Sequence, residues 1–309
     1  MEALVSSLVA DEEHENQRVG PPTILVVGGD SAIGSHLFHE ARARGLAVHR
    51  TSRRDPSLGN TLRLQLGDDS STSELLRAAQ SRSVTDAVIA LGETSIASCA
   101  NEPSATRLIN VTATQHLVET LVDIGVNVMV LSSGAVFSGH AQNPTEESAC
   151  DPETEYGRQK VELEDATLAL EGTRILRLTK VLSPSIGRWS QWIQGIQKGE
   201  KVQAFGNVKV SPLRMPVAVG AILKQIELSF GRIVHVSPPD EVTYAGAVCL
   251  MAQEMELPVN LEALHVHRDV NRGILPDRWT ALGTVYRNPS LQIESSESAM
   301  RIFTRQVVG

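Results

Sequence analysis

The sequence is poor in aromatic residues and cysteine, and it contains no long hydrophobic run. Aromatic residues make up 4% of the 309 residues, which is too few for a platform on which single-stranded nucleic acid stacks. The three cysteines, Cys99, Cys150 and Cys249, lie far apart, without CxxC spacing or a His/Cys cluster. We therefore expect free thiols, no metal site and no nucleic-acid partner.

Charge and hydropathy restrict the class further. The formal net charge of −8 opposes general binding to a phosphate backbone, although it is compatible with a local basic pocket. No apolar stretch approaches the roughly 18–20 residues needed to cross a bilayer. The N-terminus lacks the basic start of a signal peptide, and an acidic run from Asp11 to Glu15 follows almost at once. We expect a soluble, cytoplasmic protein without a membrane partner.

Strand-like and helix-like segments alternate from residue 23 to residue 178. Most of the strand-like segments are continuous apolar runs, which is typical of strands buried on both faces of a parallel sheet. Leu62–Leu66 alternates instead and is expected nearer an edge. The alternation predicts an α/β fold with a doubly wound parallel sheet of the Rossmann type. The expected strands are Thr23–Val27, Leu46–His49, Leu62–Leu66, Ala87–Leu91, Asn127–Leu131 and Arg174–Leu178, and the expected helices are Ala32–Arg44, Glu74–Ala79, Ser104–Ile124 and Glu153–Ala169.

The pattern loosens after Leu182, which indicates a second part. We expect a flexible N-terminal extension over residues 1–20, a Rossmann domain over residues 21–182 and a smaller substrate lobe over residues 183–309. The lobe is expected to be partly interleaved, with some segments returning to the first domain. It contains expected helices near Trp189–Gln197, Pro216–Leu228 and Ala245–Met255 and expected strands at Arg232–Val236 and Leu264–His267.

A glycine-rich turn follows the first expected strand and leads directly into a helix. Its residues are Gly28, Gly29, Asp30, Ser31, Ala32, Ile33 and Gly34. The spacing fits a GxxGxxG phosphate turn in which Ser31 takes the place of the middle glycine. Gly28 permits the tight turn, Gly34 permits close packing of helix on strand, and the amides at the start of the helix can hold a pyrophosphate. The turn therefore predicts dinucleotide binding.

The end of the second expected strand bears on the choice between NAD and NADP. A carboxylate there would bind the ribose 2′-hydroxyl of NAD, but no acidic residue follows the strand before Asp55. Arg53 and Arg54 suit the 2′-phosphate of NADP, with two solvated loop arginines as the alternative interpretation. Asp68, after the third strand, is placed either to meet the adenine amino group or to cap a helix.

Ser133, Tyr156 and Lys160 form a candidate catalytic set. Ser133 ends the fifth expected strand, and Tyr156 and Lys160 lie one turn apart on one face of the next expected helix. A lysine ammonium beside a phenol should lower the tyrosine pKa from about 10 toward the working range. The phenol could then exchange a proton with a substrate oxygen that the serine hydroxyl holds. A YxxxK pair alone also occurs by chance on exposed helices. The prediction of a catalytic set therefore depends on the glycine turn, the arginine pair, the serine and the YxxxK pair following one another in this order.

Together these motifs resemble the extended short-chain dehydrogenase/reductase superfamily. Within it the chain is most similar to the dTDP-4-dehydrorhamnose reductase branch, which reduces a 4-keto group on a nucleotide-activated sugar. The resemblance runs from about Thr23 to Arg214. Besides the glycine turn and the Ser133, Tyr156 and Lys160 set, it is carried by Ala90-Leu91-Gly92, Asn101-Glu102-Pro103, Asn110-Val111, Glu146, Glu164 and Ser211-Pro212.

The resemblance implies roles for individual residues. Tyr156 would be the acid/base, Lys160 would tune it and hold the nicotinamide ribose, and Ser133 would polarise the carbonyl. Leu91 would join the residues that bind NADP(H), and Asn110 would be either structural or catalytic. The resemblance also implies a homodimer built on the two long helices that are expected before and after the fifth strand.

The substrate contacts are less determined, because the chain departs from the branch in this respect. Lys180 stands where many sugar epimerases of the superfamily carry an asparagine. Four residues are candidates for binding the substrate. Thr94 lies in the loop after the fourth expected strand, and Trp192, Arg214 and Arg278 lie in the second part. For the tryptophan the alternative is packing, and for the arginines it is a surface position.

Three functions remain in view. The first is an NADP(H)-dependent reductase of a 4-keto nucleotide sugar. The second is a nucleotide-sugar epimerase or dehydratase with tightly bound NAD, which Arg53 and Arg54 oppose, as does Gly134 where a dehydratase needs an acid beside Ser133. The third is a non-catalytic, NADP-binding regulatory subunit, which the intact Ser133, Tyr156 and Lys160 set opposes.

Overall fold

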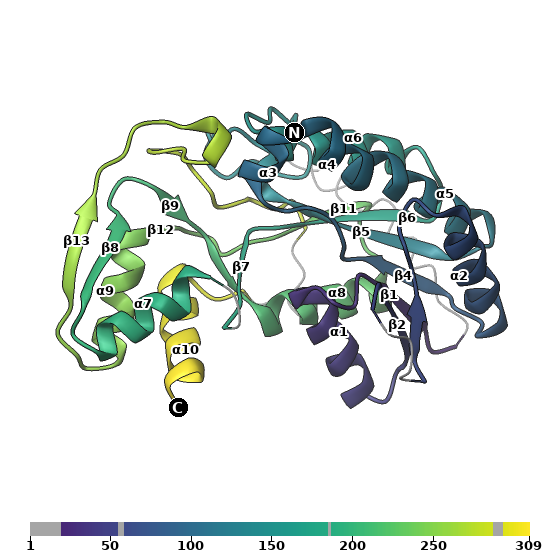
Figure 1. Ribbon diagram of the computed structural model, residues 1–309, viewed down its shortest axis with the longest axis horizontal. Coiled ribbons are helices and arrows are strands. Elements are labelled where there is room, and N and C mark those ends of the chain that lie inside the picture. The colour runs from purple at the N-terminus through teal and green to yellow at the C-terminus, as the bar shows by residue number, and fades with distance from the viewer. Residues whose placement is uncertain (1–19, 55–58, 185–186, 287–292) are drawn as a thin grey trace, which may run out of the picture.

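The structure is a computed structural model that describes residues 20–54, 59–184, 187–286 and 293–309. A seven-stranded parallel sheet flanked by helices forms the larger part, and a smaller lobe stands beside it (Figure 1). This arrangement confirms the expected doubly wound α/β fold. The predicted flexible extension, residues 1–20, lies outside the described residues except for Gly20.

The order of the strands in the main sheet places a switch point beside the first strand. The chain runs outward from β1 through β2 to β3, and then returns to build β4, β5, β6 and β11 on the other side of β1. In such a sheet the crevice for a ligand opens at the carboxyl ends of the strands, where the order reverses. β3 lies at an edge, as the alternation in its sequence predicted. The strands are β1 Thr23–Val27, β2 Ala47–Ser52, β3 Thr61–Arg63, β4 Asp86–Ile89, β5 Asn127–Ser133, β6 Thr173–Leu178 and β11 Ile233–Val236.

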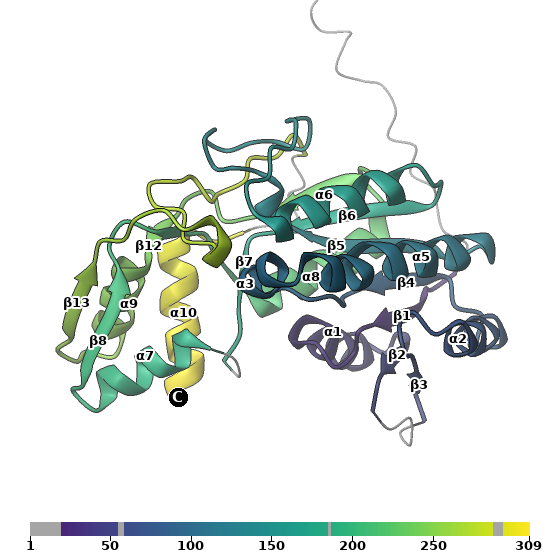
Figure 2. The same cartoon turned by 45° about the horizontal axis from the view of Figure 1, so that its top comes forward.

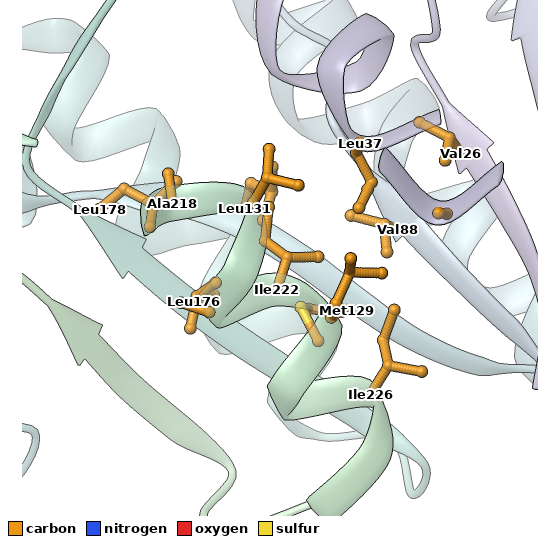
Figure 3. Close-up of a cluster of buried hydrophobic side chains, with 14 of the residues drawn as sticks. Val26, Leu37, Val88, Met129, Leu131, Leu176, Leu178, Ala218, Ile222 and Ile226 are labelled. Carbon is orange, nitrogen blue, oxygen red and sulfur yellow. The ribbon is translucent and has the colours of Figure 1, made fainter. Parts of the chain in front are cut away.

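Two hydrophobic cores, one on each face, hold this sheet in place. Ile24 and Val26 of β1 join the core under α1 and α8, whereas Leu25 and Val27 join the core under α2, α5 and α6. All four side chains are fully buried, and each such burial stabilises the fold by roughly 1.5–3 kcal/mol. Figure 2 shows the two helical layers, and Figure 3 shows the first core. The helices are α1 Ala32–Ala43, α2 Asp69–Ser81, α5 Thr114–Asp123, α6 Glu155–Leu168 and α8 Met215–Leu228.

The helix expected over Ser104–Ile124 is interrupted. α4 (Pro103–Arg107) passes into a π-helical segment, Leu108–Ala113, before α5 begins. The extra residue in a π turn displaces the helix surface, and here Asn110 is buried. A short helix that the sequence pattern did not predict, α3 (Ile96–Asn101), precedes α4.

The smaller lobe has a core of its own. Trp189, Trp192 and Tyr244 pack against one another at ring-centroid distances of 5.3, 5.6 and 5.9 Å. The C-terminal helix α10 was not expected from the sequence; it packs on α9 and contributes Met300 and Phe303 to this core. The expected strand Leu264–His267 is shifted, because β13 ends at Leu264. The lobe contains α7 Arg188–Gln197, β8 Lys201–Phe205, β9 Lys209–Val210, β12 Val242–Thr243, α9 Tyr244–Glu254, β13 Asn260–Leu264 and α10 Ser296–Val308, and the short pair β7 Lys180–Leu182 and β10 Pro212–Arg214 lies between it and the sheet.

Residues 265–286, which we call the return segment, lead from the lobe back to the main sheet. Gly273 lies against Ile96 of α3. Further along, the Trp279 amide donates to the Gly139 carbonyl at 3.0 Å, and the Thr284 hydroxyl donates to Glu146 at 2.7 Å. The return segment therefore crosses above the carboxyl ends of the strands (Figure 1).

Candidate active site

The glycine turn lies at the switch point of the sheet. Gly28 has a φ of +92°, and a Cβ there would stand 2.7 Å from the carbonyl oxygen of Ala90, which follows β4. A Cβ at Gly34 would run into the Gly28 carbonyl oxygen. The Ser31 hydroxyl caps α1 by accepting from the Gly34 amide at 3.0 Å. The glycines therefore let the turn pack closely against the chain after β4 and against α1, and the turn places the N-terminus of α1, where backbone amides can bind a pyrophosphate, at the switch point.

The other residues expected to hold a dinucleotide lie around this turn. Ala32 and Ile33 form the first turn of α1 and pack partly on the core below it. Leu91 follows β4, and its Cβ would be 2.9 Å from a Cβ on Gly28. Asp68 caps α2 by accepting from the Ser70 amide at 3.1 Å, which is the structural alternative that the sequence left open. Binding of the adenine by Asp68 stays a prediction.

The end of β2 is tied to the glycine turn. The Gly28 amide donates to the Thr51 hydroxyl at 2.9 Å. The Asp30 carboxylate accepts from the Ser52 hydroxyl at 2.8 Å and from the Arg53 amide at 3.3 Å. A carboxylate therefore does stand at the end of the second strand. It comes from the turn and not from the strand, so the local sequence around β2 did not reveal it.

Ser133, Tyr156 and Lys160 are brought together at the carboxyl end of β5. The Thr154 hydroxyl caps α6, and a Cβ on Gly157 would run into the Ala135 carbonyl oxygen, so α6 packs tightly on the chain that follows β5. Lys160 donates from Nζ to the Leu131 carbonyl at 3.0 Å, and Nζ lies 5.8 Å from the centre of the Tyr156 ring.

Burial controls the electrostatics of this group. The Tyr156 side chain is buried, and desolvation raises its pKa to about 12, against a smaller lowering by the hydrogen bond with Ser133. The expected lowering by the lysine is therefore wrong for this structure. Burial also lowers the pKa of Lys160 to about 8, although Glu164 opposes this. At neutral pH Tyr156 is a neutral proton donor beside a largely protonated lysine.

Asn110 links the loop after β4 to α6. Its Oδ1 accepts from the Glu93 amide at 2.7 Å, and its Nδ2 donates to the Glu93 carbonyl at 2.9 Å and to Gln159 Oε1 at 2.8 Å. Gln159 is fully enclosed and precedes Lys160 on α6. Asn110 therefore has the structural role that was one of the two alternatives expected for it. The contribution of Gln159 was not evident from the sequence, because it depends on the π segment.

The candidate substrate residues do not form one group. Trp192 is buried in the core of the lobe, where its Nε1 donates to the Gln203 carbonyl at 3.1 Å. Arg214 forms an ion pair with Glu294. Thr94 is exposed in the loop between β4 and α3.

Arg278 lies in the return segment and faces the loop before α6. Glu153, three residues before Tyr156, accepts from Arg278 at 3.2 Å and also pairs with His140 and Arg268. The return segment itself borders a hollow of about 530 Å³ that is lined in part by His267, Arg268 and Arg272. Glu153 thus pairs with both Arg268 and Arg278, and the lining of the hollow carries Arg268 and Arg272 together with one carboxylate, that of Asp269.

Comparison with known proteins identifies the class. Residues 24–212 match the model of the NAD dependent epimerase/dehydratase family, and the chain belongs to this family. This confirms the resemblance to the extended short-chain dehydrogenase/reductases, which are NAD(P)-dependent oxidoreductases. Within the described residues, no helix is long and apolar enough to cross a membrane, and no three His, Cys, Asp or Glu side chains gather as metal ligands would.

Individual relatives are distant. Human sterol-4-alpha-carboxylate 3-dehydrogenase, decarboxylating, is 27% identical over an alignment of 186 residues that covers 57% of this chain; the chain spans about half the length of this curated relative, 47%. Among solved structures, dTDP-4-dehydrorhamnose reductase from Bacillus anthracis in complex with NADP has a TM-score of 0.75 at 16% identity, over 92% of this chain and 98% of that chain. UDP-glucose 4-epimerase from Thermotoga maritima with UDP-glucose has a TM-score of 0.72 at 18% identity, over 93% and 99%. These structural similarities show the fold.

Proposed function

We propose that the chain is an NADP(H)-dependent reductase of a 4-keto group on a nucleotide-activated sugar. One observation carries the proposal: the buried phenol of Tyr156 stands beside Ser133 and Lys160 at the carboxyl edge of a sheet whose first strand leads through a tight glycine turn into the N-terminus of α1. The exposed arginines Arg53 and Arg54 at the end of β2 favour the phosphorylated cofactor.

The residues of the chain divide the work of the reduction. The nicotinamide, when bound, supplies the hydride. Tyr156 donates its proton to the carbonyl oxygen, and because its pKa is about 12 it is protonated at every working pH. The Ser133 hydroxyl holds the same oxygen, and the Lys160 ammonium stabilises negative charge that develops there.

The surroundings of the return segment support an anionic substrate. Two arginines, Arg268 and Arg272, and one carboxylate, Asp269, line the hollow above the sheet edge, and a third arginine, Arg278, lies close by on Glu153. Guanidinium groups bind phosphate oxygens in pairs, so this region suits the diphosphate of a sugar nucleotide. The dTDP-4-dehydrorhamnose reductase fold, which this chain shares, agrees with a 4-keto sugar as the reacting part.

The test is NADPH oxidation with a panel of 4-keto sugar nucleotides. We expect turnover by the wild type and a loss of about 100-fold or more in kcat for Tyr156→Phe, since general acid catalysis contributes that much. Binding of NADPH should persist in this variant. Tyr286→Phe is the matched control, because its hydroxyl has no hydrogen-bond partner among the described residues. Full activity of Tyr156→Phe would refute the proposal.

An epimerase or dehydratase with tightly held NAD is the second candidate, favoured by the name of the matching family. It requires the oxidised cofactor to stay on the enzyme through each turnover. Purified protein that carries one equivalent of NAD, and that converts sugar nucleotides without consuming NADPH, would establish it. Cofactor binding without any turnover would instead indicate the regulatory subunit.

We also propose that two copies pair through their α4–α5 and α6 surfaces. Leu108 and Ile109 in the π segment are 59% and 45% exposed, which is unusual for large apolar side chains side by side. Light scattering at micromolar concentration is expected to give twice the mass of one chain, and Leu108→Glu should yield monomers.

A further inference from the structure

Among the described residues, Asp30 places a carboxylate at the end of β2, where Arg53 and Arg54 also lie. Its Oδ2 accepts two hydrogen bonds, from the Ser52 hydroxyl at 2.8 Å and from the Arg53 amide at 3.3 Å. Its other oxygen, Oδ1, has no hydrogen-bond partner among the described residues, and the side chain is exposed. The carboxylate therefore keeps free acceptor capacity at the end of β2.

The glycine turn is joined to the end of β2 by hydrogen bonds and close packing. The amides of Gly28 and Gly29 donate to the hydroxyl and the carbonyl oxygen of Thr51 at 2.9 and 3.0 Å. A Cβ on Gly29 would stand 2.7 Å from the Arg50 Cβ. In doubly wound folds the end of the second strand is where the ribose 2′ group of a dinucleotide is recognised. Asp30 is fastened to that end by side chain and backbone.

Two opposite charges meet there. Arg53 and Arg54 are exposed, and within the described part of the chain neither guanidinium pairs with a carboxylate. They attract a 2′-phosphate, whereas the Asp30 carboxylate repels it and offers Oδ1 to a 2′-hydroxyl. The Asp30 side chain also holds the Arg53 amide, so the opposing groups occupy the same corner of the site.

We propose that Asp30 is a specificity-determining residue that limits the preference for NADP(H) over NAD(H), so that the chain binds both forms. The inference rests on the proposed binding of a nicotinamide cofactor at this turn. It makes the preference a balance between a hydrogen-bonded carboxylate and two exposed arginines. Neutralising Asp30 should strengthen the preference for NADP(H), and replacing Arg53 and Arg54 should weaken it.

The experiment measures Kd for NADPH and NADH by cofactor fluorescence in the wild type and in Asp30→Asn. The asparagine carbonyl can still accept from Ser52 and Arg53, so the turn is retained while the charge is lost. We expect the ratio of Kd for NADH to Kd for NADPH to rise about tenfold, through tighter NADPH and weaker NADH binding. In Arg53→Met/Arg54→Met the ratio should fall by about tenfold or more.

Controls separate this inference from the proposed function. Asp123→Asn removes an exposed carboxylate from the end of α5, and the ratio should not change. Asp30→Ser, which keeps a shorter acceptor, should raise the ratio as Asp30→Asn does, and thermal melting checks that both variants fold. Equal weakening of both cofactors, or an unchanged ratio, would overturn the specificity role and leave cofactor binding intact. Failure of the wild type to bind either cofactor would overturn the proposed function and this inference together.

Discussion

Substitution of Lys160 by methionine should remove the proposed reductase activity and, at neutral pH, raise the free energy of unfolding. The ammonium is buried, with desolvation lowering its pKa from 10.5 to about 8. Keeping the charge in the folded state at pH 7 therefore costs ~3 kcal/mol. Methionine has a similar length and no charge to bury.

The stabilisation expected for Lys160→Met is reduced because the variant loses one hydrogen bond. Lys160 Nζ donates to the Leu131 carbonyl at 3.0 Å, and leaving that oxygen without a partner costs ~1 kcal/mol. The net effect is a stabilisation of about 2 kcal/mol, or a rise in Tm of about 4 °C for a chain of this size. The control Lys198→Met removes an exposed ammonium and should change stability by less than about 0.5 kcal/mol.

The pH dependence has a definite sign. Below about pH 8 the lysine is protonated in both the folded and the unfolded states, so the full cost is present. As the pH rises from 8 toward 10.5, the folded state releases its proton first and the cost disappears. Scanning calorimetry at pH 7 and pH 10 should therefore show a gap in Tm between Lys160→Met and wild type that shrinks at high pH.

Two results would refute this account. If Lys160→Met melts below the wild type at pH 7, or the gap is the same at both pH values, then the burial cost is wrong. If the variant keeps more than about a tenth of the wild-type kcat, then the ammonium does not take part in the chemistry. The same titration predicts that kcat for reduction falls above about pH 8, as Lys160 loses its charge.

Three further predictions concern residues that hold the candidate active site in place. Gly28→Ala should lower the free energy of unfolding by about 2 kcal/mol or more in urea titrations, because its φ is +92° and its Cβ would meet the Ala90 carbonyl oxygen at 2.7 Å; an unchanged midpoint contradicts this. Arg177→Met should cost about 3–5 kcal/mol, since it leaves Glu164 buried without its ion pair, and adding Glu164→Leu should restore most of the loss. Asn110→Leu should lower kcat/KM about tenfold through the displaced loop after β4, whereas unaltered kinetics would limit Asn110 to stability.

The hydrophobic pattern along the sequence predicted most of the main sheet, because each strand and helix is formed by neighbouring residues. After Thr23, the four residues of β1 from Ile24 to Val27 are apolar, and they divide alternately between two cores. The order of strand and helix then leaves few possible topologies, since parallel connections are right-handed and short. The Ser133, Tyr156 and Lys160 set was predictable for the same reason, as one strand and the next helix carry all three.

Features that depend on distant segments were not predictable in this way. The π segment that buries Asn110 looks like ordinary helix in the sequence. α10 is separated by much of the lobe from the strands and helices it covers. Trp192 lies in a core and not in a pocket because Trp189 and Tyr244 enclose it.

The strands of the main sheet, the glycine turn and the order of Ser133, Tyr156 and Lys160 can be inferred from sequence because neighbouring residues carry these patterns. Which side chains from different segments meet depends on the folded arrangement of the chain. It placed the Asp30 carboxylate beside Ser52 and Arg53, and it brought Arg278 of the return segment to Glu153. Such contacts depend on how the strands and loops are arranged in space, and a hydrophobic pattern read along the chain contains no information about charges that approach one another across it.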